Sequence, residues 1–244
     1  MRLVAWNLGH QTLERPINPR FSEYVDKLSP DILTLNEYVH GSTRGHFIET
    51  LGAIGLTHVK CSVRIRSNNQ VLIASRLPFE SGDLVGPDTE DGGGSSNFLH
   101  ITFPDSGLAV VGIRVPAYEK KSVLEDYWTK LLALIRSTQN REIVFLGDFN
   151  ADPDMPKSFA GATLAALRSL GWQIPAPSGS WSFVSGSRID HVVAGPGIGG
   201  LQAAYVAELD NAVLASRDTL NRVSDHAALM VDLDNEKSGG RVLG

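Results

Sequence analysis

The chain has 244 residues, is 42% hydrophobic and 20% charged, and carries a formal net charge of −5. Its apolar runs are too short to span a membrane, its early polar residues do not fit a signal peptide, and its one cysteine, Cys61, cannot form an internal disulfide. We therefore expect a protein of the reducing cytoplasm without a membrane span. The acidic balance argues against holding long duplex DNA mainly through a basic face, and it suits a small anionic substrate at least as well.

Short apolar runs rich in Val, Ile and Leu alternate with turn signals along almost the whole chain, which predicts many strands. We expect these strands at Arg2–Leu8, Asp31–Asn36, Thr57–Val63, Gln70–Ala74, Phe98–Phe103, Ala109–Val115, Ile143–Leu146, Arg188–Ala194, Leu201–Glu208 and Ala228–Leu233. Helical periodicity is clearest over Lys121–Thr138, and shorter helices are expected at Phe21–Leu28, Arg44–Ile54 and Ser158–Leu170.

This mixture is too rich in strands for a simple doubly wound sheet. Many strands are apolar on both faces, as in a sheet that packs against another sheet on one side and against helices on the other. We expect one domain over residues 1–234, a frayed and disordered tail over 235–244, a mobile loop at Gly86–Asn97, and a monomer.

Polar side chains stand at the ends of several of these strands. Asp148 and Asn150 follow the buried strand Ile143–Leu146 at period-two spacing, so both would leave the same side of an extended backbone. Their oxygen atoms would suit magnesium, or a water polarised beside a phosphate. Four further strand boundaries carry Asn7, Glu37, Asp190 and the pair Asp225–His226.

Each of these residues also has a structural interpretation. Asp148 and Asn150 could form an Asx turn, and Asn7 could cap one. Glu37 could face solvent, Asp190 could pair with Arg188, and His226 could be a satisfied core or surface histidine. Buried carboxylates persist when they are paired, hydrogen-bonded or bound to metal. The five boundaries together favour a functional site, because coincidence at every one of them is improbable.

The ordered set resembles a known superfamily, the endonuclease/exonuclease/phosphatase proteins, over about Met1 to Leu233. The resemblance is carried by Trp6-Asn7, Asn36-Glu37, Gly147-Asp148-Phe149-Asn150-Ala151, Arg188-Ile189-Asp190-His191 and Ser224-Asp225-His226. It implies an α/β fold with a four-layered α/β/β/α sandwich, in which two packed mixed sheets are flanked by helices. It also implies hydrolysis of a phosphate ester that depends on Mg²⁺ or Mn²⁺.

The resemblance also implies a role for each matching residue. Glu37 would be the principal metal ligand, with help from Asn7 and Asp225. Asp148 would orient or deprotonate the attacking water, and Asn150 would hold a phosphate oxygen or a second ion. His226 would bind the phosphoryl group and stabilise its developing charge, and Asp190 would fix the orientation of His226.

The sequence departs from the superfamily at three positions. Arg114 stands where many members have a histidine or tyrosine facing the phosphate, and we expect its planar fork to clamp phosphate oxygens. Gly9 stands where apurinic-site enzymes have an acid, which puts in doubt a second-metal arrangement that relies on it. Asn36 replaces the commoner glutamine, a change that we expect to be tolerated.

The sequence is compatible with three functions. The first is a nuclease or DNA-end-processing phosphodiesterase, and the second is a phosphatase or phosphodiesterase for small or lipid phosphates of the inositol-phosphate type. The third is a catalytically silent phosphate-binding module. Trp181 and Phe183 could stack on a base or pack in the core, and we favour the core for Phe183. The retained acids and His226 argue against the silent module.

Overall fold

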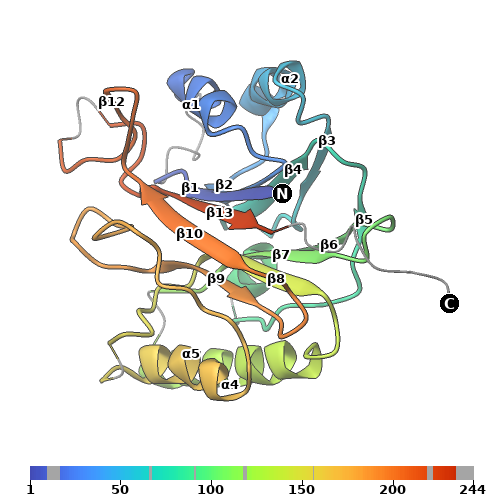
Figure 1. The fold of residues 1–244 in the computed structure, drawn as a ribbon, viewed down its shortest axis with the longest axis vertical. Helices are drawn as coiled ribbons and strands as arrows, with labels where there is room; N and C mark the ends of the chain where they lie inside the picture. Colours follow the sequence, from blue (N-terminus) through green and yellow to red (C-terminus); the bar gives the residue numbers. More distant parts are fainter. Residues whose placement is uncertain are drawn as a thin grey trace, which may run out of the picture.

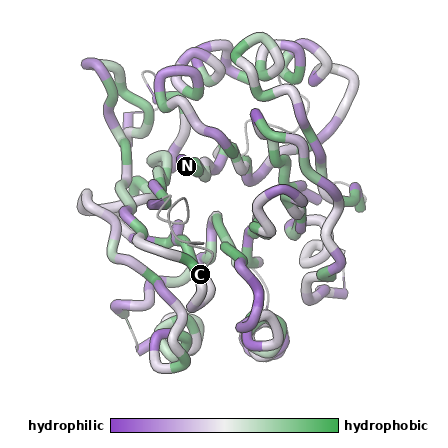
Figure 2. The backbone as a smooth tube through the Cα atoms, turned by 45° about the vertical axis from the view of Figure 1, so that its right-hand side comes forward, coloured by the Kyte–Doolittle hydropathy of each residue, from purple (hydrophilic) through white to green (hydrophobic). Residues whose placement is uncertain are grey.

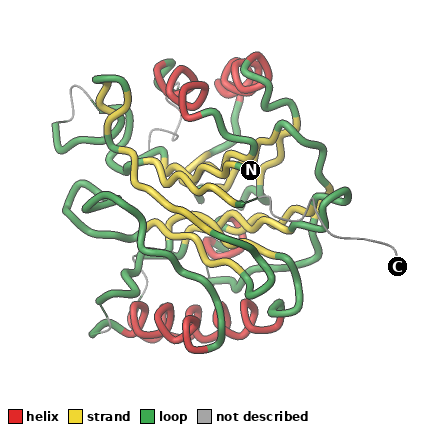
Figure 3. Tube along the Cα trace, viewed as in Figure 1, coloured by secondary structure: helices red, strands yellow, loops and turns green. Residues whose placement is uncertain are grey.

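The computed structural model describes residues 1–9, 17–65, 68–90, 92–117, 120–155, 157–218 and 222–234. The expected tail over 235–244 lies outside these ranges. Two β-sheets stack face to face, and a pair of helices covers the outer face of each sheet (Figure 1). The expected four-layered α/β/β/α sandwich is therefore confirmed, and Figure 3 shows the strands between the two helical layers.

The first sheet has six strands in the order β10-β13-β1-β2-β4-β3. These strands are Leu201–Val206, Ala228–Leu233, Arg2–Asn7, Ile32–Tyr38, Gln70–Ser75 and His58–Cys61. Only β1 and β2 are parallel among these pairs, because helix α1 (Arg20–Leu28) carries the chain back between them. Helix α2 (Gly45–Ala53) follows β2 and a short 3₁₀ turn, Ser42–Arg44.

The second sheet has five strands in the order β5-β6-β7-β8-β9. They are Glu80–Ser81, Phe98–Thr102, Ala109–Arg114, Ile143–Asp148 and Asp190–Ala194. The parallel pair is β7–β8, connected through α4 (Lys121–Ser137), and α5 (Phe159–Ser169) follows β8. Both sheets thus repeat one arrangement, in which a parallel pair with a helical crossover is flanked by antiparallel neighbours.

Strand alternation divides the core into three layers. Leu3 and Ala5 of β1 pack between the sheets, while Val4 and Trp6 pack against α1 and α2. Strand β8 alternates in the same way between the inter-sheet core and the core under α4 and α5. Figure 2 shows hydrophobic positions, in green, along the central strands and hydrophilic positions, in purple, recurring in the outer helices and loops. None of the described helices is long and apolar enough to cross a membrane.

Most predicted elements are present, with ends shifted by one to three residues in most cases. The largest difference lies at Gly86–Asn97, predicted as a mobile loop, where the described residues include a short helix, α3 (Gly93–Ser96). Asp88 and Thr89 hold this segment, since Asp88 Oδ1 accepts from Ser95 N at 3.0 Å and Thr89 Oγ1 accepts from Gly94 N at 3.0 Å. The predicted strand to Glu208 instead ends at Val206, and Glu208–Leu209 (β11) forms a small hairpin with Ala212–Val213 (β12).

The prediction that β8 ends at Leu146 was wrong by two residues. Gly147 continues the strand at φ +143, a conformation that residues with side chains rarely adopt. A Cβ at Gly147 would lie 2.2 Å from the carbonyl oxygen of Ile113 and 2.8 Å from Oδ1 of Asn36. Glycine is therefore required where β8 passes close to β7 and β2, and Asp148 becomes the last residue of the strand.

Candidate active site

Period-two alternation brings the predicted polar residues to one end of the space between the sheets. Asn7 continues the inward series of Leu3 and Ala5, and Asp148 continues that of Val144 and Leu146. Strands β1, β2, β7 and β8 all end at this edge, and β9 and β13 run antiparallel and begin there. Asn7 Nδ2 donates to Asp148 Oδ2 at 3.1 Å, a hydrogen bond that joins the two sheets.

Glu37 reaches the same space through an irregularity in β2. The register with β4 shifts between Leu35 and Tyr38, and both of these side chains pack in the outer core. One extra residue is therefore accommodated, and Glu37 adopts φ +56. Its carboxylate is buried and accepts from Arg114, whose Nε and Nη2 both lie 3.0 Å from Glu37 Oε1. A strained backbone conformation at a polar residue is typical of functional sites.

Asp148 is enclosed by other residues of the cluster. Besides its bond with Asn7, its Oδ1 accepts from Asn150 N at 2.9 Å, and its own backbone N donates to Asn36 Oδ1 at 3.2 Å. Burial, followed by the charge of Asp190, raises the pKa of Asp148 to about 6. A carboxyl group with this pKa can accept a proton near neutral pH.

The backbone does not stay extended from Asp148 to Asn150, and of the two interpretations of this segment the Asx turn is the one that forms. Asn150 adopts φ +47, and its backbone N bonds back to the side chain of Asp148, as in an Asx turn. Its Nδ2 donates to the carbonyl oxygen of Val115 at 2.7 Å. The structural and the functional interpretation of this segment are therefore compatible, because the turn holds the Asp148 carboxylate in place.

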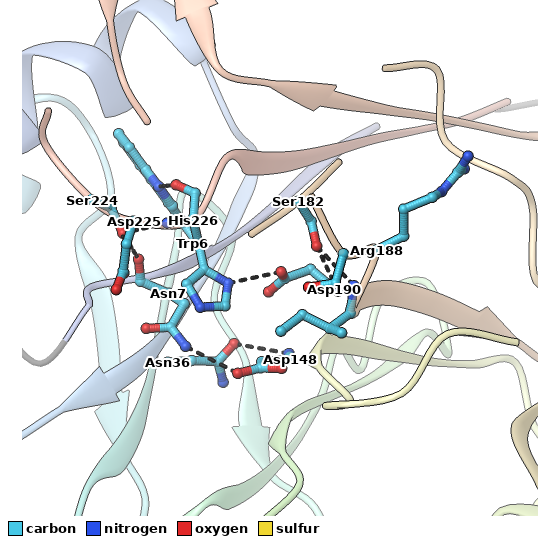
Figure 4. Close-up of polar contacts among 12 residues, drawn as sticks. Trp6, Asn7, Asn36, Asp148, Ser182, Arg188, Asp190, Ser224, Asp225 and His226 are labelled. Atoms are coloured by element: carbon cyan, nitrogen blue, oxygen red, sulfur yellow. Dashed lines mark hydrogen bonds and ion pairs between the residues drawn. The ribbon is translucent and has the colours of Figure 1, made fainter. Parts of the chain in front are cut away.

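Asp190 and His226 form a buried pair beside Asp148 (Figure 4). His226 Nδ1 lies 2.8 Å from Asp190 Oδ2, and both side chains are almost completely buried. Burial lowers the pKa of His226, but the Asp190 carboxylate, with Asp148 and Asp225 nearby, outweighs it and raises the pKa to about 9. His226 is therefore an imidazolium at neutral pH. The Arg188 side chain points away from Asp190 and donates to the carbonyl oxygen of Pro177, so the ion pair considered for Arg188 and Asp190 does not form.

The hydroxyl groups of Ser182, Tyr205 and Ser224 position this pair. Ser182 Oγ accepts from Asp190 N at 3.1 Å, and Tyr205 donates its hydroxyl to the carbonyl oxygen of Asp190 at 2.8 Å. Ser224 Oγ donates to the carbonyl oxygen of Asn7 at 2.6 Å and accepts from His226 N at 3.0 Å. The Ser182 and Tyr205 hydroxyls gave no signal in the sequence, because serine and tyrosine are common in loops and strands, whereas Ser224 stands in the Ser224-Asp225-His226 motif.

Gly9 and Asp225 lie together at the edge of the site. Gly9 N donates to Asn7 Oδ1 at 2.9 Å, and a Cβ at Gly9 would lie 2.3 Å from Asp225 Oδ1. The backbone at Gly9 is also left-handed, at φ +65. The space that an acidic side chain would need at this position is therefore filled by Asp225.

The charges and donor atoms of the site fit a divalent cation. Four carboxylates, from Glu37, Asp148, Asp190 and Asp225, face two cationic groups, Arg114 and the imidazolium of His226, which leaves two negative charges in excess. The oxygen donors of Glu37, Asp225 and Asn7 are those that small hard cations prefer. Among the described residues, Asp148, Asp190 and His226 also place ligand atoms within 4.8 Å of one another, although His226 and Asp190 already bond to each other.

The two aromatic residues considered for base stacking, Trp181 and Phe183, are only partly buried. The ring centroids of Phe183 and His226 lie 4.8 Å apart, and the two residues also face each other in an isolated β-bridge. Phe183 is half-buried, so the prediction of a core residue was wrong. Trp181 is half-buried and packs against the inter-sheet core.

Two sheets with an acid–imidazole cluster between their ends define the class of DNase I-like hydrolase folds. The chain belongs to the Endonuclease/Exonuclease/phosphatase family, whose sequence model matches residues 4–226. The resemblance inferred from the sequence is therefore confirmed. A search of curated protein sequences found no match.

Solved structures with this fold include several members of the same class. The 3′-5′ exonuclease NExo from Neisseria meningitidis has a TM-score of 0.71 and 22% identity, over 96% of this chain and 100% of that chain. An AP endonuclease from Archaeoglobus fulgidus has a TM-score of 0.65 and 18% identity, over 96% and 99%. An endonuclease/exonuclease/phosphatase protein from Beutenbergia cavernae DSM 12333 has a TM-score of 0.69 and 19% identity, over 96% and 71%. At these identities the likeness establishes the fold.

Proposed function

We propose that this protein is a phosphoesterase, dependent on Mg²⁺ or Mn²⁺, that hydrolyses a phosphodiester or phosphomonoester as a nuclease or DNA-end-processing enzyme. The observation that carries the proposal is the buried Asp190–His226 pair beside Asp148, which combines a fixed cationic donor with a carboxylate that titrates near neutrality. Family membership supports the reaction class. A related structure, the 3′ phosphatase NExo bound to a product DNA hairpin, supports a nucleic-acid substrate.

The proposed mechanism assigns one task to each residue. Asp148 accepts a proton from the attacking water, and Asn150 holds its carboxylate through the backbone N–H. His226 donates a charged hydrogen bond to a phosphate oxygen, and Asp190 fixes its ring. Arg114 clamps another phosphate oxygen.

Glu37, Asn7 and Asp225 would hold the cation, and Asp148 and Asn150 are the candidate ligands for any second ion. The cation, when bound, neutralises charge on the phosphate oxygens and assists the leaving group. The burial of Asp148, Asp190 and His226 would strengthen their interactions with the phosphate and the attacking water.

The test is hydrolysis of a chromogenic phosphodiester with Mg²⁺ or Mn²⁺ and with a chelator. Asp148→Asn and His226→Gln should each lower kcat by about 100-fold or more, because each removes a proton-transfer or charge-stabilising group. The exposed residues Asp105 and His46 offer matched controls, Asp105→Asn and His46→Gln. Absence of metal-dependent hydrolysis of any phosphate ester would favour a silent phosphate-binding module. Turnover of inositol phosphates without nicking of a plasmid would favour the small- or lipid-phosphate alternative.

A further inference from the structure

A pocket of about 380 Å³ opens beside Asn150, between the first turns of α4 and α5. Its walls are mainly apolar, and they include Pro116, Leu124, Trp128, Phe159 and Ala160. The volume lies near the lower end of the range for small-molecule sites, so the pocket has room for one ring system.

The pocket and the reacting carboxylate share one residue. Asn150 lines the pocket, and its backbone N donates to Asp148 Oδ1 at 2.9 Å. A hydrogen bond from the Asn150 side-chain amide to the carbonyl oxygen of Val115 fixes Asn150 at the edge of the pocket. A phosphate facing Asp148 would therefore carry one of its ester groups next to the pocket.

The lining determines which kind of ester group fits. Phe159 is the first residue of α5 and is 45% exposed. Its ring therefore contributes aromatic surface to the pocket wall. Lys121 is the one basic residue among the described lining residues, and its Nζ lies 3.7 Å from Oε1 of Glu125, which also lines the pocket. These two charges offset each other. A ring carrying several phosphates would find no excess positive charge here, whereas a flat, largely apolar ring matches the walls.

We infer that this pocket binds the nucleobase of a nucleotide whose phosphate is the reacting group. The inference rests on the proposed function and adds to it a binding site for the base, which favours nucleotide esters over inositol phosphates. The pocket contributes binding and specificity, and it takes no part in bond cleavage.

The test compares p-nitrophenyl esters that share a leaving group. Thymidine 5′- and 3′-p-nitrophenyl phosphate, methyl p-nitrophenyl phosphate and hexyl p-nitrophenyl phosphate are hydrolysed with Mg²⁺ present. At least one thymidine ester should exceed the methyl ester in kcat/KM by about tenfold, mainly through a lower KM, as expected for one stacked base. The hexyl ester should fall well below that thymidine ester.

Two variants locate the effect. Phe159→Ala removes a wall, and Ala117→Trp fills the pocket from an exposed position. Either change should reduce the thymidine-to-methyl ratio of kcat/KM to within about twofold, because stacking on the walls supplies the preference. Met155→Ala removes an exposed apolar side chain outside the lining and should keep the full ratio. A general structural defect would lower both constants in proportion and leave the ratio intact.

The outcomes separate this inference from the proposed function. Equal turnover of all esters, a preference for the hexyl ester, or a ratio that both variants leave intact would overturn the nucleobase pocket and leave the phosphoesterase standing. No metal-dependent hydrolysis of any ester, including the methyl ester, would overturn the proposed function itself.

Discussion

At the scale of single residues, Arg114 occupies an unusual position between two carboxylates. Its guanidinium lies 3.0 Å from Glu37 Oε1 and 3.9 Å from Asp148 Oδ2. The same cation that could clamp a phosphate thus also neutralises the principal candidate metal ligand. Arg114 should therefore have opposite effects on cation affinity and on turnover.

Arg114→Ala separates these effects. Loss of a nearby positive charge should tighten Mn²⁺ binding by about tenfold, measured by calorimetric titration, because a like charge no longer opposes the ion. The same change should lower kcat on a phosphodiester by at least about tenfold through loss of the clamp. Arg141→Ala, which breaks an exposed pair with Asp83, serves as the control. Unchanged turnover in Arg114→Ala would reject the clamp.

The charge of His226 depends on Asp190. Because burial lowers the pKa of His226 and the Asp190 carboxylate raises it more than either of the other two acids, Asp190→Asn should lower this pKa from about 9. NMR titration of the His226 ring in chelator measures this change. Asp225→Asn removes a smaller contribution and should move the pKa less. Equal shifts in the two variants would contradict the assignment of Asp190 as the partner.

Residue types predicted which side chains cluster, but they predicted the local backbone poorly. Asn7, Glu37, Asp148, Asp190 and His226 were recognisable because acids and amides rarely follow apolar strands without a role. The positive φ angle at Glu37 could not be predicted, because glutamate is compatible with an extended strand, and at Asn150 residue type could not decide between an extended strand and an Asx turn. The contributions of the Ser182 and Tyr205 hydroxyls were missed because hydrogen bonds to backbone groups depend on tertiary contacts.

At the scale of elements, β8 depends on close contact with its neighbours at Gly147. Gly147→Ala places a Cβ against the Ile113 carbonyl and forces a positive φ on alanine, so it should lower the free energy of unfolding by about 2 kcal/mol or more. Denaturant unfolding measures the change. A Cβ added at Gly41 would meet nothing within 4 Å, and the φ there is an extended −166, so Gly41→Ala should be nearly neutral. A loss in Gly147→Ala no greater than that in Gly41→Ala would contradict the close contact.

Element type was predictable because hydrophobic periodicity was strong. Helix α4 and the strands with alternating or fully apolar patterns follow from the sequence. Strands of two residues, such as β5 and β11, were missed because they are too short to show a period and depend on pairing with a neighbour. The helix α3 was missed because a run of glycines and serines predicts a loop, and its stability comes from side-chain bonds to Asp88 and Thr89.

At the scale of the whole molecule, the site exists only when both sheets are assembled. Asn7, Glu37, Asp225 and His226 come from the first sheet or its adjoining loops, and the remaining charged groups come from the second. The electrostatic field that sets the two perturbed pKa values is therefore a property of the packed sandwich.

The pH–rate profile should report this combined field. The proposed mechanism requires an ionised Asp148 and a protonated His226, so kcat/KM should rise through about pH 6 and fall through about pH 9. A bound cation would favour the Asp148 carboxylate and move the acidic limb lower. Asp190→Asn should move the alkaline limb toward lower pH. A rate that keeps rising through pH 9 would contradict the requirement for an imidazolium.

The position of Glu37 depends on the extra residue that β2 accommodates between Leu35 and Tyr38. Deletion of one residue between Leu35 and Tyr38 would restore a regular ladder with β4 and remove the left-handed conformation of Glu37. The shortened protein would keep Leu35 and Tyr38 in the outer core. Asn36 and Glu37 both contact the second sheet in the intact protein, and after the deletion only one polar side chain between Leu35 and Tyr38 could do so. Under the proposed mechanism, the loss of one residue here should give a folded protein without phosphoesterase activity, so the length of β2 couples the strand pairing to the composition of the site.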